Sequence, residues 1–261
     1  MPETFLADHS DGVLTVTLDR PQRLNATNRV AAAEMAAFWT EVARDVSVRC
    51  IVLTGAGRAF CAGADAEDMA TSVRPRGDIG YIAAVDFCPG EYVKVPIIAA
   101  VNGLCVGAGL SFVADADLVI ASSDAWFSDP HVAVGQVSAM EPLMLAPKLP
   151  YGVIAKLVLL ANSYRMSAAE ALEAGLVHEV VAPDRLMARA HEMATVISSQ
   201  SPTAVRESLA VLRRFARSLI AEQLDDAWDV AFGHFGHPDA TEGPQAFLDK
   251  RSPRWVDPAS N

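Results

Sequence analysis

The stretch PIIAAVNGLCVGAGLSFVADADLVIAS, residues 96–122, carries the pattern that decides the fold. Its two ends are apolar runs that predict buried strands, and the glycine-rich turn between them leads into a short helix. Residues 13–19 (VLTVTLD) alternate apolar and polar side chains as a half-buried strand does, while residues 28–45 repeat apolar side chains at helical spacing. Residues 49–57 (RCIVLTGAG) form another apolar run that glycines end. This alternation of strands and helices predicts an α/β core.

The last part of the chain has a different character, because extended patterns almost vanish after residue 141. The run LVHEVVA is the one segment there that predicts a strand. Ser201 and Pro202 are typical of the N-cap and first turn of a helix. The apolar side chains that we expect on its buried face are Val205, Leu209, Leu212 and Phe215. We therefore divide the chain into a core, residues 1–200, and a helical region, residues 201–261.

Charge and composition exclude several classes of partner. The formal net charge of −11 argues against nucleic acid or an anionic membrane as the main partner. The N-terminus, MPETFLADHSDG, has no basic segment followed by an apolar one, so it predicts no secretion signal. Four cysteines form no CxxC pair and no compact Cys/His cluster, so we expect no metal, no disulfide framework and a reducing, cytoplasmic location. These are Cys50, Cys61, Cys88 and Cys105.

Two common glycine motifs are incomplete in this chain. The segment LTGAGRAF follows a strand and begins G-x-G, but Phe60 stands where the dinucleotide-binding fingerprint has a small residue. The segment GLSFV places Ser111 after a glycine, but Val113 stands where the nucleophile elbow has its second glycine. We therefore expect neither a nicotinamide site nor an elbow serine.

Two turns of very small residues predict a different kind of site. One lies in FCAGADAEDM, residues 60–69, and the other in VGAGL, residues 106–110. If one backbone N–H from each turn points at the same spot, the two form an oxyanion hole, and small side chains let a ligand's carbonyl approach the backbone. The acids that follow the first turn favour a helix start there.

In this order, the segments resemble those of the crotonase, or enoyl-CoA hydratase/isomerase, superfamily, over nearly the whole chain. The resemblance implies an α/β spiral of ββα units with a C-terminal helical trimerisation region, assembled as a homotrimer or as a hexamer of two trimers. It also implies an acyl-CoA substrate, with coenzyme A as part of the substrate and no separate cofactor. The matching landmarks are DRPQRLNA, GAGRAFCAGADAEDM, the stretch 96–122, GLVHEVV and AFLDKR.

The resemblance also assigns roles to individual positions. Ala64 and Ala108 match the residues whose backbone N–H groups hold the thioester enolate. Phe247 and Lys250 match positions that reach the coenzyme A of a neighbouring subunit. The remaining substrate-binding positions that the resemblance implies are Arg23, Ala62 and Asp65.

This chain departs from the family's hydratases at both catalytic glutamates, which Ser111 and His131 replace. His131 can serve as a general base near neutral pH, because imidazole has a pKa of about 6.5, and Asp129 can orient it. Glu141 lies where related isomerases place a carboxylate. Glu141 also fits a capping box with Ser138. In that case the two side chains would only stabilise the start of a helix. For Ser111 a structural role is equally consistent with the sequence: a small polar residue in the first turn of a helix can form a local hydrogen bond.

The residues thus favour an acyl-CoA-binding enzyme of the enoyl-CoA hydratase/isomerase type that stabilises a thioester enolate. Its reaction is either a lyase-type hydration or an isomerisation, with His131 or Glu141 moving protons. One alternative is a C–C or thioester hydrolase that uses Asp129, His131 and Ser111. The other is a non-catalytic acyl-CoA-binding protein. We expect residues 66–94 and the helices after residue 140 to select the acyl group.

Overall fold

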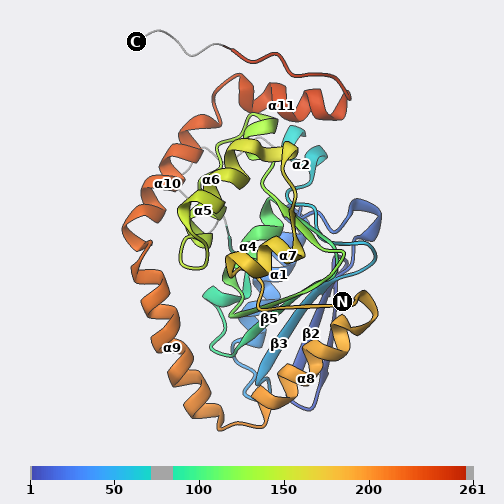
Figure 1. Ribbon diagram of the computed structural model, residues 1–261, viewed down its shortest axis with the longest axis vertical. Helices are drawn as coiled ribbons and strands as arrows, with labels where there is room; N and C mark the ends of the chain where they lie inside the picture. The colour runs from blue at the N-terminus through green and yellow to red at the C-terminus, as the bar shows by residue number, and fades with distance from the viewer. Residues whose placement is uncertain (1, 72–84, 257–261) are drawn as a thin grey trace.

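The computed structural model describes residues 2–71 and 85–256 of the chain, which form two sheets surrounded by helices (Figure 1). Among these residues the larger sheet has six strands in the order β1-β2-β3-β5-β7-β10. β1 is antiparallel to β2, and the other neighbours in the sheet are parallel. The strands are β1 (Phe5–Ser10), β2 (Val13–Leu18), β3 (Cys50–Gly55), β5 (Ile97–Val101), β7 (Leu118–Ser122) and β10 (Glu179–Val181).

A smaller sheet runs beside the first and, within the described ranges, contains four short strands in the order β4-β6-β8-β9. β4 follows β3, β6 follows β5 and β8 follows β7, so each turn of the chain adds one strand to each sheet. This is the predicted spiral of ββα units, and the predicted fold class is confirmed. The strands are β4 (Ala59–Cys61), β6 (Leu104–Val106), β8 (Trp126–Ser128) and β9 (Met166–Ser167).

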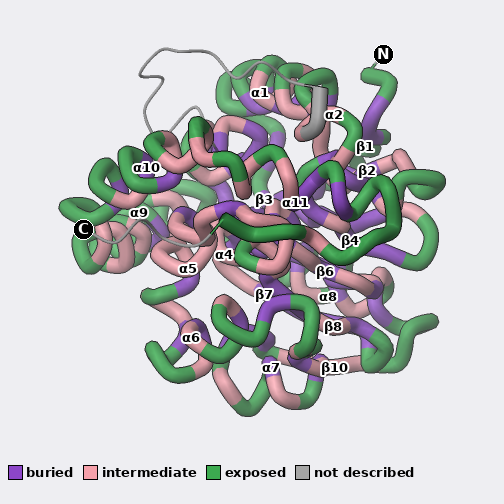
Figure 2. Tube along the Cα trace, turned by 90° about the horizontal axis from the view of Figure 1, so that it is seen from above, coloured by how far each residue is buried: buried purple, intermediate pink, exposed green. Residues whose placement is uncertain are grey.

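Helices cover both faces of the larger sheet. Along β3, Ile51 and Leu53 join the main core, whereas Cys50 and Val52 face the opposite side and pack with α8. Successive side chains of a strand point to opposite faces of the sheet, and here both faces are buried. For this reason the parallel strands appear in the sequence as continuous apolar runs. Figure 2 shows the buried segments gathered at the strands and exposed segments along the surrounding helices.

The helices begin where local sequence favours them. The side chain of Asn28 accepts a hydrogen bond from the Ala31 N–H and so caps α1. Glu67 and Asp68 lie in the first turn of α2, as predicted from the acids after the first small-residue turn. The helices are α1 (Arg29–Val42), α2 (Ala66–Thr71), α4 (Ala108–Asp115), α5 (Met140–Leu145), α6 (Tyr151–Leu160), α7 (Ala168–Ala174), α8 (Leu186–Ser198), α9 (Pro202–Ser218), α10 (Ala221–His234) and α11 (Asp239–Leu248).

Short 3-10 turns connect several of these elements. One of them, η3, carries the histidine that the sequence singles out. The 3-10 turns are η1 (Pro21–Arg23), η2 (Pro89–Glu91), η3 (His131–Val134), η4 (Ala161–Ser163) and η5 (Pro183–Arg185). None of the helices in the described part of the chain is long and apolar enough to cross a membrane.

The C-terminal helices α9, α10 and α11 run along one side of the molecule and across one end, in orange and red in Figure 1. The Ser201 hydroxyl caps α9 by accepting the Ala204 N–H, as predicted. The predicted buried face is wrong in part: Leu209 is buried, but Leu212 is 64% exposed and Phe215 is 66% exposed. The reason is that α9 contacts the core through Leu209 and Arg213, while these two apolar side chains project into solvent.

Candidate active site

The two small-residue turns meet in the structure. Gly63 and Gly107 have φ angles of 93° and 53°, a region that glycine adopts without strain. A Cβ atom built on Gly63 would lie 3.0 Å from the Val106 carbonyl oxygen and 3.5 Å from the Ala108 nitrogen. The turns are therefore in direct contact, and a side chain at Gly63 would push them apart.

Backbone pairing determines where the amide groups of these turns point. Thr27 pairs with Ala64 in a parallel bridge: its N–H donates to the Gly63 oxygen at 2.8 Å, and its carbonyl accepts the Asp65 N–H at 2.9 Å. Because successive N–H groups of an extended segment point in opposite directions, the Ala64 N–H points away from Thr27. Ala108 is the first residue of α4, where an N–H has no partner within the helix.

A cavity of about 580 Å³ opens beside both turns. The predicted residues that line it come from the turn after β4 and from α4, η3, α5 and α11. They are Ala62, Ala64, Ala108, His131, Glu141 and Phe247. Val134, Val137 and Met140 form an apolar part of its wall. Trp228 of α10 and Phe235, the residue directly after α10, add to it. Met69, Val85 and Phe87 also line it, whereas residues 72–84 of the expected acyl-selecting segment lie outside the described residues.

The buried carboxylate of Asp129 is hydrogen-bonded to His131. Asp129 is only 2% exposed, and its Oδ1 accepts hydrogen bonds from the His131 backbone N–H at 3.1 Å and from the ring Nδ1 at 2.6 Å. The Ser138 hydroxyl donates to Oδ2 of the same carboxylate at 2.5 Å. Burial acts to raise the pKa of Asp129, but these hydrogen bonds and the nearby imidazole lower it below its ordinary value. Asp129 therefore carries a negative charge at neutral pH.

Glu141 lies on the other side of the imidazole. Its Oε1 is 4.0 Å from Nε2 of His131 and accepts a hydrogen bond from the Ser111 hydroxyl at 3.3 Å. The capping-box interpretation of Ser138 and Glu141 is wrong, because α5 starts after Ala139 with no side-chain cap. The Ser138 hydroxyl instead contacts Asp129, and the Glu141 carboxylate approaches His131. The hydroxyl of Ser111 likewise contacts Glu141 across 30 residues of sequence and not a local backbone group.

This arrangement can move protons. An imidazole and a carboxylate face each other at 4.0 Å, and both border the cavity. Imidazole and carboxylate are side chains that commonly transfer protons in catalysis, and each is held by a second polar group, Asp129 or Ser111. The cavity is thus bordered by an imidazole and a carboxylate and by the two turns that carry Ala64 and Ala108.

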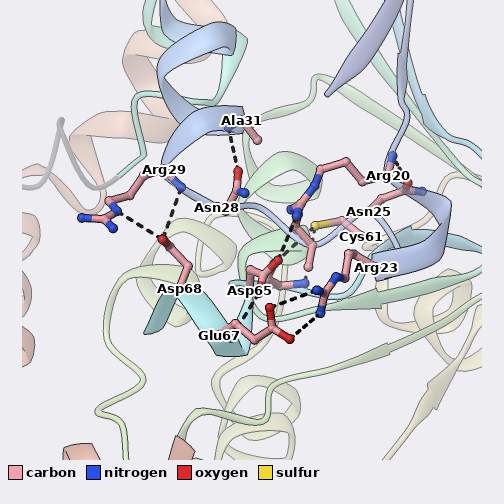
Figure 3. A network of polar contacts seen from close by, with 12 residues as sticks. Arg20, Arg23, Asn25, Asn28, Arg29, Ala31, Cys61, Asp65, Glu67 and Asp68 are labelled. Atoms are coloured by element: carbon pink, nitrogen blue, oxygen red, sulfur yellow. Dashed lines mark hydrogen bonds and ion pairs between the residues drawn. The ribbon is translucent and has the colours of Figure 1, made fainter. Parts of the chain in front are cut away.

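Three predicted substrate-binding residues lie elsewhere. Arg23 is exposed and paired with Glu67 through two contacts of 2.9 Å, and Asp65 is buried and paired with Arg20 at 3.0 Å (Figure 3). Ala64 and Ala66 line the cavity, whereas the Asp65 side chain points to Arg20, and the role of Asp65 in substrate binding stays a prediction.

These ion pairs have a structural role, since they join the segment before α1 to α2 (Figure 3). Lys250 is exposed and is not part of the cavity wall. Its predicted contact, like the coenzyme A contact of Phe247, involves a neighbouring subunit and stays a prediction.

Sequence reasoning missed two contributions to the site. It assigned Ser138 only to a helix cap, because a hydroxyl three residues before a glutamate is a local signal and the contact with Asp129 is not. It also missed Trp228 of α10 and Phe235, which directly follows this helix. Their spacing of seven residues places them on one helix face, but the pattern does not say which surface that face covers.

Comparison with solved structures places the fold among the crotonase-type proteins. The crystal structure of an enoyl-CoA hydratase/isomerase from Pseudoalteromonas atlantica has a TM-score of 0.86 at 28% identity, covering 97% of this chain and all of that one (100%). The carnitinyl-CoA hydratase of Mycobacterium avium has a TM-score of 0.83 at 29% identity, covering 99% of this chain and 100% of that one.

Sequence comparison gives the family. The sequence profile described as enoyl-CoA hydratase/isomerase matches residues 8–258. A 1,2-epoxyphenylacetyl-CoA isomerase of Escherichia coli is 34% identical over 268 residues, covering 98% of this chain and 99% of that protein. This chain therefore belongs to the enoyl-CoA hydratase/isomerase family, and the predicted resemblance is confirmed.

Proposed function

We propose that this protein adds water to the double bond of an enoyl-CoA thioester, or eliminates water in the reverse direction, with His131 and Glu141 as the proton carriers. The observation that carries the proposal is the 4.0 Å approach of His131 Nε2 and Glu141 Oε1 at the wall of the cavity. The reaction needs no cofactor besides the coenzyme A that the substrate carries.

In this proposal the N–H groups of Ala64 and Ala108 form the oxyanion hole. The thioester carbonyl sits between the two turns, and its oxygen becomes negative when water adds at Cβ and the enolate forms. A backbone donor aimed at such an oxygen stabilises the transition state by about 3–4 kcal/mol. The contact between the turns at Gly63 supports this role, because it brings the turn that carries Ala64 against the turn that carries Ala108.

Hydration requires one group that takes a proton from water and one that gives a proton to Cα. The His131–Glu141 pair provides both. Water bonds to Cβ through its oxygen and passes a proton to one group, while the other protonates Cα of the enolate. Transfer of one proton across the 4.0 Å gap then restores the starting state. Both replaced glutamates of the family's hydratases are thus compensated by residues of this chain.

Hydrolysis is the second candidate, since Asp129, His131 and Ser111 lie within one network. A serine nucleophile must hydrogen-bond the histidine that activates it. The Ser111 hydroxyl is hydrogen-bonded to Glu141, which favours a role in holding the carboxylate. For this reason we rank hydration above hydrolysis.

The test is a reaction of the protein with crotonyl-CoA and with a longer enoyl-CoA, followed by loss of the enoyl thioester absorbance and by product mass. We expect a product heavier by one water molecule. His131→Ala and Glu141→Gln should each lower turnover by about 10²- to 10⁴-fold. His191→Ala and Glu192→Gln, on the outer helix α8, are matched controls and should retain turnover.

Other outcomes identify the alternatives. A product of unchanged mass with a moved double bond indicates an isomerase, and release of free coenzyme A indicates a thioester hydrolase. Tight binding of the whole panel by calorimetry without turnover indicates a non-catalytic acyl-CoA-binding protein. Each of these results would overturn hydration as the reaction.

A further inference from the structure

We propose that Ser138 is a positioning residue of this site, and that its hydroxyl holds Asp129 so that the imidazole of His131 presents Nε2 to Glu141. The inference rests on the proposed function and extends it to a residue whose sequence signal indicates only a helix cap. The hydroxyl of Ser138 hydrogen-bonds to Oδ2 of Asp129. It acts through Asp129.

The carboxylate of Asp129 is held at both oxygens. Oδ1 accepts the backbone N–H and the ring Nδ1 of His131, while Oδ2 accepts the Ser138 hydroxyl at 2.5 Å. The contacts to Oδ1 alone hold one oxygen, so the carboxylate can still pivot about that oxygen and change its plane. The contact from Ser138 fixes the second oxygen and therefore the plane of the carboxylate.

The direction of these hydrogen bonds follows from charge. The pKa of Asp129 is lowered, because the hydrogen bonds from His131 and Ser138 together with the imidazole outweigh the cost of burial. An ionised carboxylate has no proton to donate, so the Ser138 O–H and the His131 Nδ1–H must be the donors. The tautomer of His131 is thereby set, with Nε2 as the atom that faces Glu141 at 4.0 Å.

Because of its position in the chain, Ser138 can hold the segments of His131 and Glu141 together through its hydrogen bond to Asp129. Ser138 lies in the loop between η3, which carries His131, and α5, which carries Glu141. Its hydrogen bond to Asp129 ties the two segments together. The same loop is also fastened on its outer side, where the Gln136 side chain donates to the Ala240 carbonyl at 2.8 Å. The loop therefore has an anchor that does not depend on the Ser138 hydroxyl.

The experiment compares Ser138→Ala and Ser138→Thr with the native protein. With enoyl-CoA as substrate, we expect Ser138→Ala to lower kcat by about 10- to 100-fold, the effect of losing one hydrogen bond to a charged group, with KM nearly unchanged. Ser138→Thr keeps the hydroxyl and should restore most of kcat. Ser167→Ala removes a serine hydroxyl that caps α7 and is the matched control.

Nitrogen NMR of the free, histidine-labelled protein provides a readout that does not depend on activity. We expect His131 to be in the Nδ1–H form in the native protein and in Ser138→Thr, and to show a mixture of tautomers in Ser138→Ala. If Ser138→Ala does not fold, Ser138→Cys replaces it, since a thiol is a weak donor of similar size, and an intermediate mixture is expected.

The two proposals fail in different ways. A changed His131 signature in Ser138→Ala supports the positioning role even if the native protein hydrates no enoyl-CoA, a result that overturns only the proposed function. An unchanged His131 signature overturns the positioning role whatever happens to kcat. Equal losses of kcat in Ser138→Ala and Ser167→Ala also overturn it, because they indicate a general loss of stability.

Discussion

Asp129 is the residue on which the electrostatics of the site depend. It is almost fully buried, yet its pKa is lowered, since hydrogen bonds from His131 and Ser138 and the neighbouring imidazole outweigh burial. The pattern Asp-x-His made this pair predictable from the sequence. The contacts of Ser138 with Asp129 and of Ser111 with Glu141 were not predictable, because they cross between segments that only the fold brings together.

The lowered pKa of Asp129 predicts a pH-dependent contribution to stability. An unfolded aspartate has a pKa of about 3.9, and the folded value is lower, so the stabilisation is present above about pH 4 and is lost as the pH falls through the folded pKa. Asp129→Asn should therefore be less stable than the native protein at pH 7, with the gap narrowing below pH 4. Urea unfolding at several pH values measures this, and a gap independent of pH would contradict it.

Gly63 allows a prediction about the two turns. Alanine at this position would be strained at φ 93° and would place Cβ 3.0 Å from the Val106 oxygen. We expect Gly63→Ala to cost about 1–3 kcal/mol of stability and to lower turnover at least about tenfold by separating the amides of Ala64 and Ala108. Steady-state kinetics and urea unfolding measure both effects.

Gly152 supplies the matched control for this substitution. It lies in α6, where an added Cβ would meet nothing within 4 Å. Gly152→Ala should leave turnover unchanged and keep or raise stability, because alanine favours helix. Equal behaviour of the two variants would contradict the role given to Gly63.

At the scale of elements, α9 is attached to the core chiefly through Arg213. Its guanidinium pairs with both carboxylate oxygens of Asp117, at 2.9 and 2.6 Å, and donates to the carbonyls of Val93 and Val95 at 2.7 and 3.1 Å. A planar group with several fixed donors suits this position, which joins α9 to the segment entering β5 and to the start of β7.

We expect Arg213→Met to destabilise the docking of α9 by about 3 kcal/mol, since it leaves the Asp117 carboxylate without its partner. Hydrogen exchange should then show α9 opening before the core. The exposed neighbour Arg214 is the control, and Arg214→Met should leave exchange unchanged. Slow exchange throughout α9 in Arg213→Met would contradict the attachment described here.

Local sequence predicts some of these elements better than others. The Ser201–Pro202 start of α9 and the acids of α2 were predictable, because caps and first-turn charges act within a few residues. Strands of three residues, such as β4 and β6, are too short to show a period. The start of α5 was predicted wrongly, because Ser138 bonds to Asp129 and not to its own helix.

At the scale of the whole molecule, the apolar side chains left in solvent by α9 favour association. Leu212 and Phe215 of this helix and Leu219 directly after it are all more than half exposed. This agrees with the oligomer implied by the resemblance, and we predict a trimer or hexamer by sedimentation equilibrium at micromolar concentration. Phe215→Glu should dissociate it, with Glu222→Gln as a neutral control. A monomeric native protein would contradict the prediction.

The overall fold was predictable because five landmarks occur in the family's order along nearly the whole chain. The burial pattern of its C-terminal helices was not, since the same apolar stripe suits either the core or another subunit. The reaction follows still less from the fold, because Ser111 and His131 stand where the resemblance places the two glutamates of the hydratases. The 4.0 Å approach of His131 to Glu141, on which the proposed proton transfer rests, is visible only in the structure.

The most direct test of the account is the turnover of crotonyl-CoA by the native protein, His131→Ala and Glu141→Gln, with binding of the same ester measured by calorimetry. The account predicts a hydrated product from the native protein, turnover lower by about 10²- to 10⁴-fold in each variant, and binding retained in all three. Unchanged turnover in either variant, or a native protein that binds the ester and does not hydrate it, would contradict the central claim.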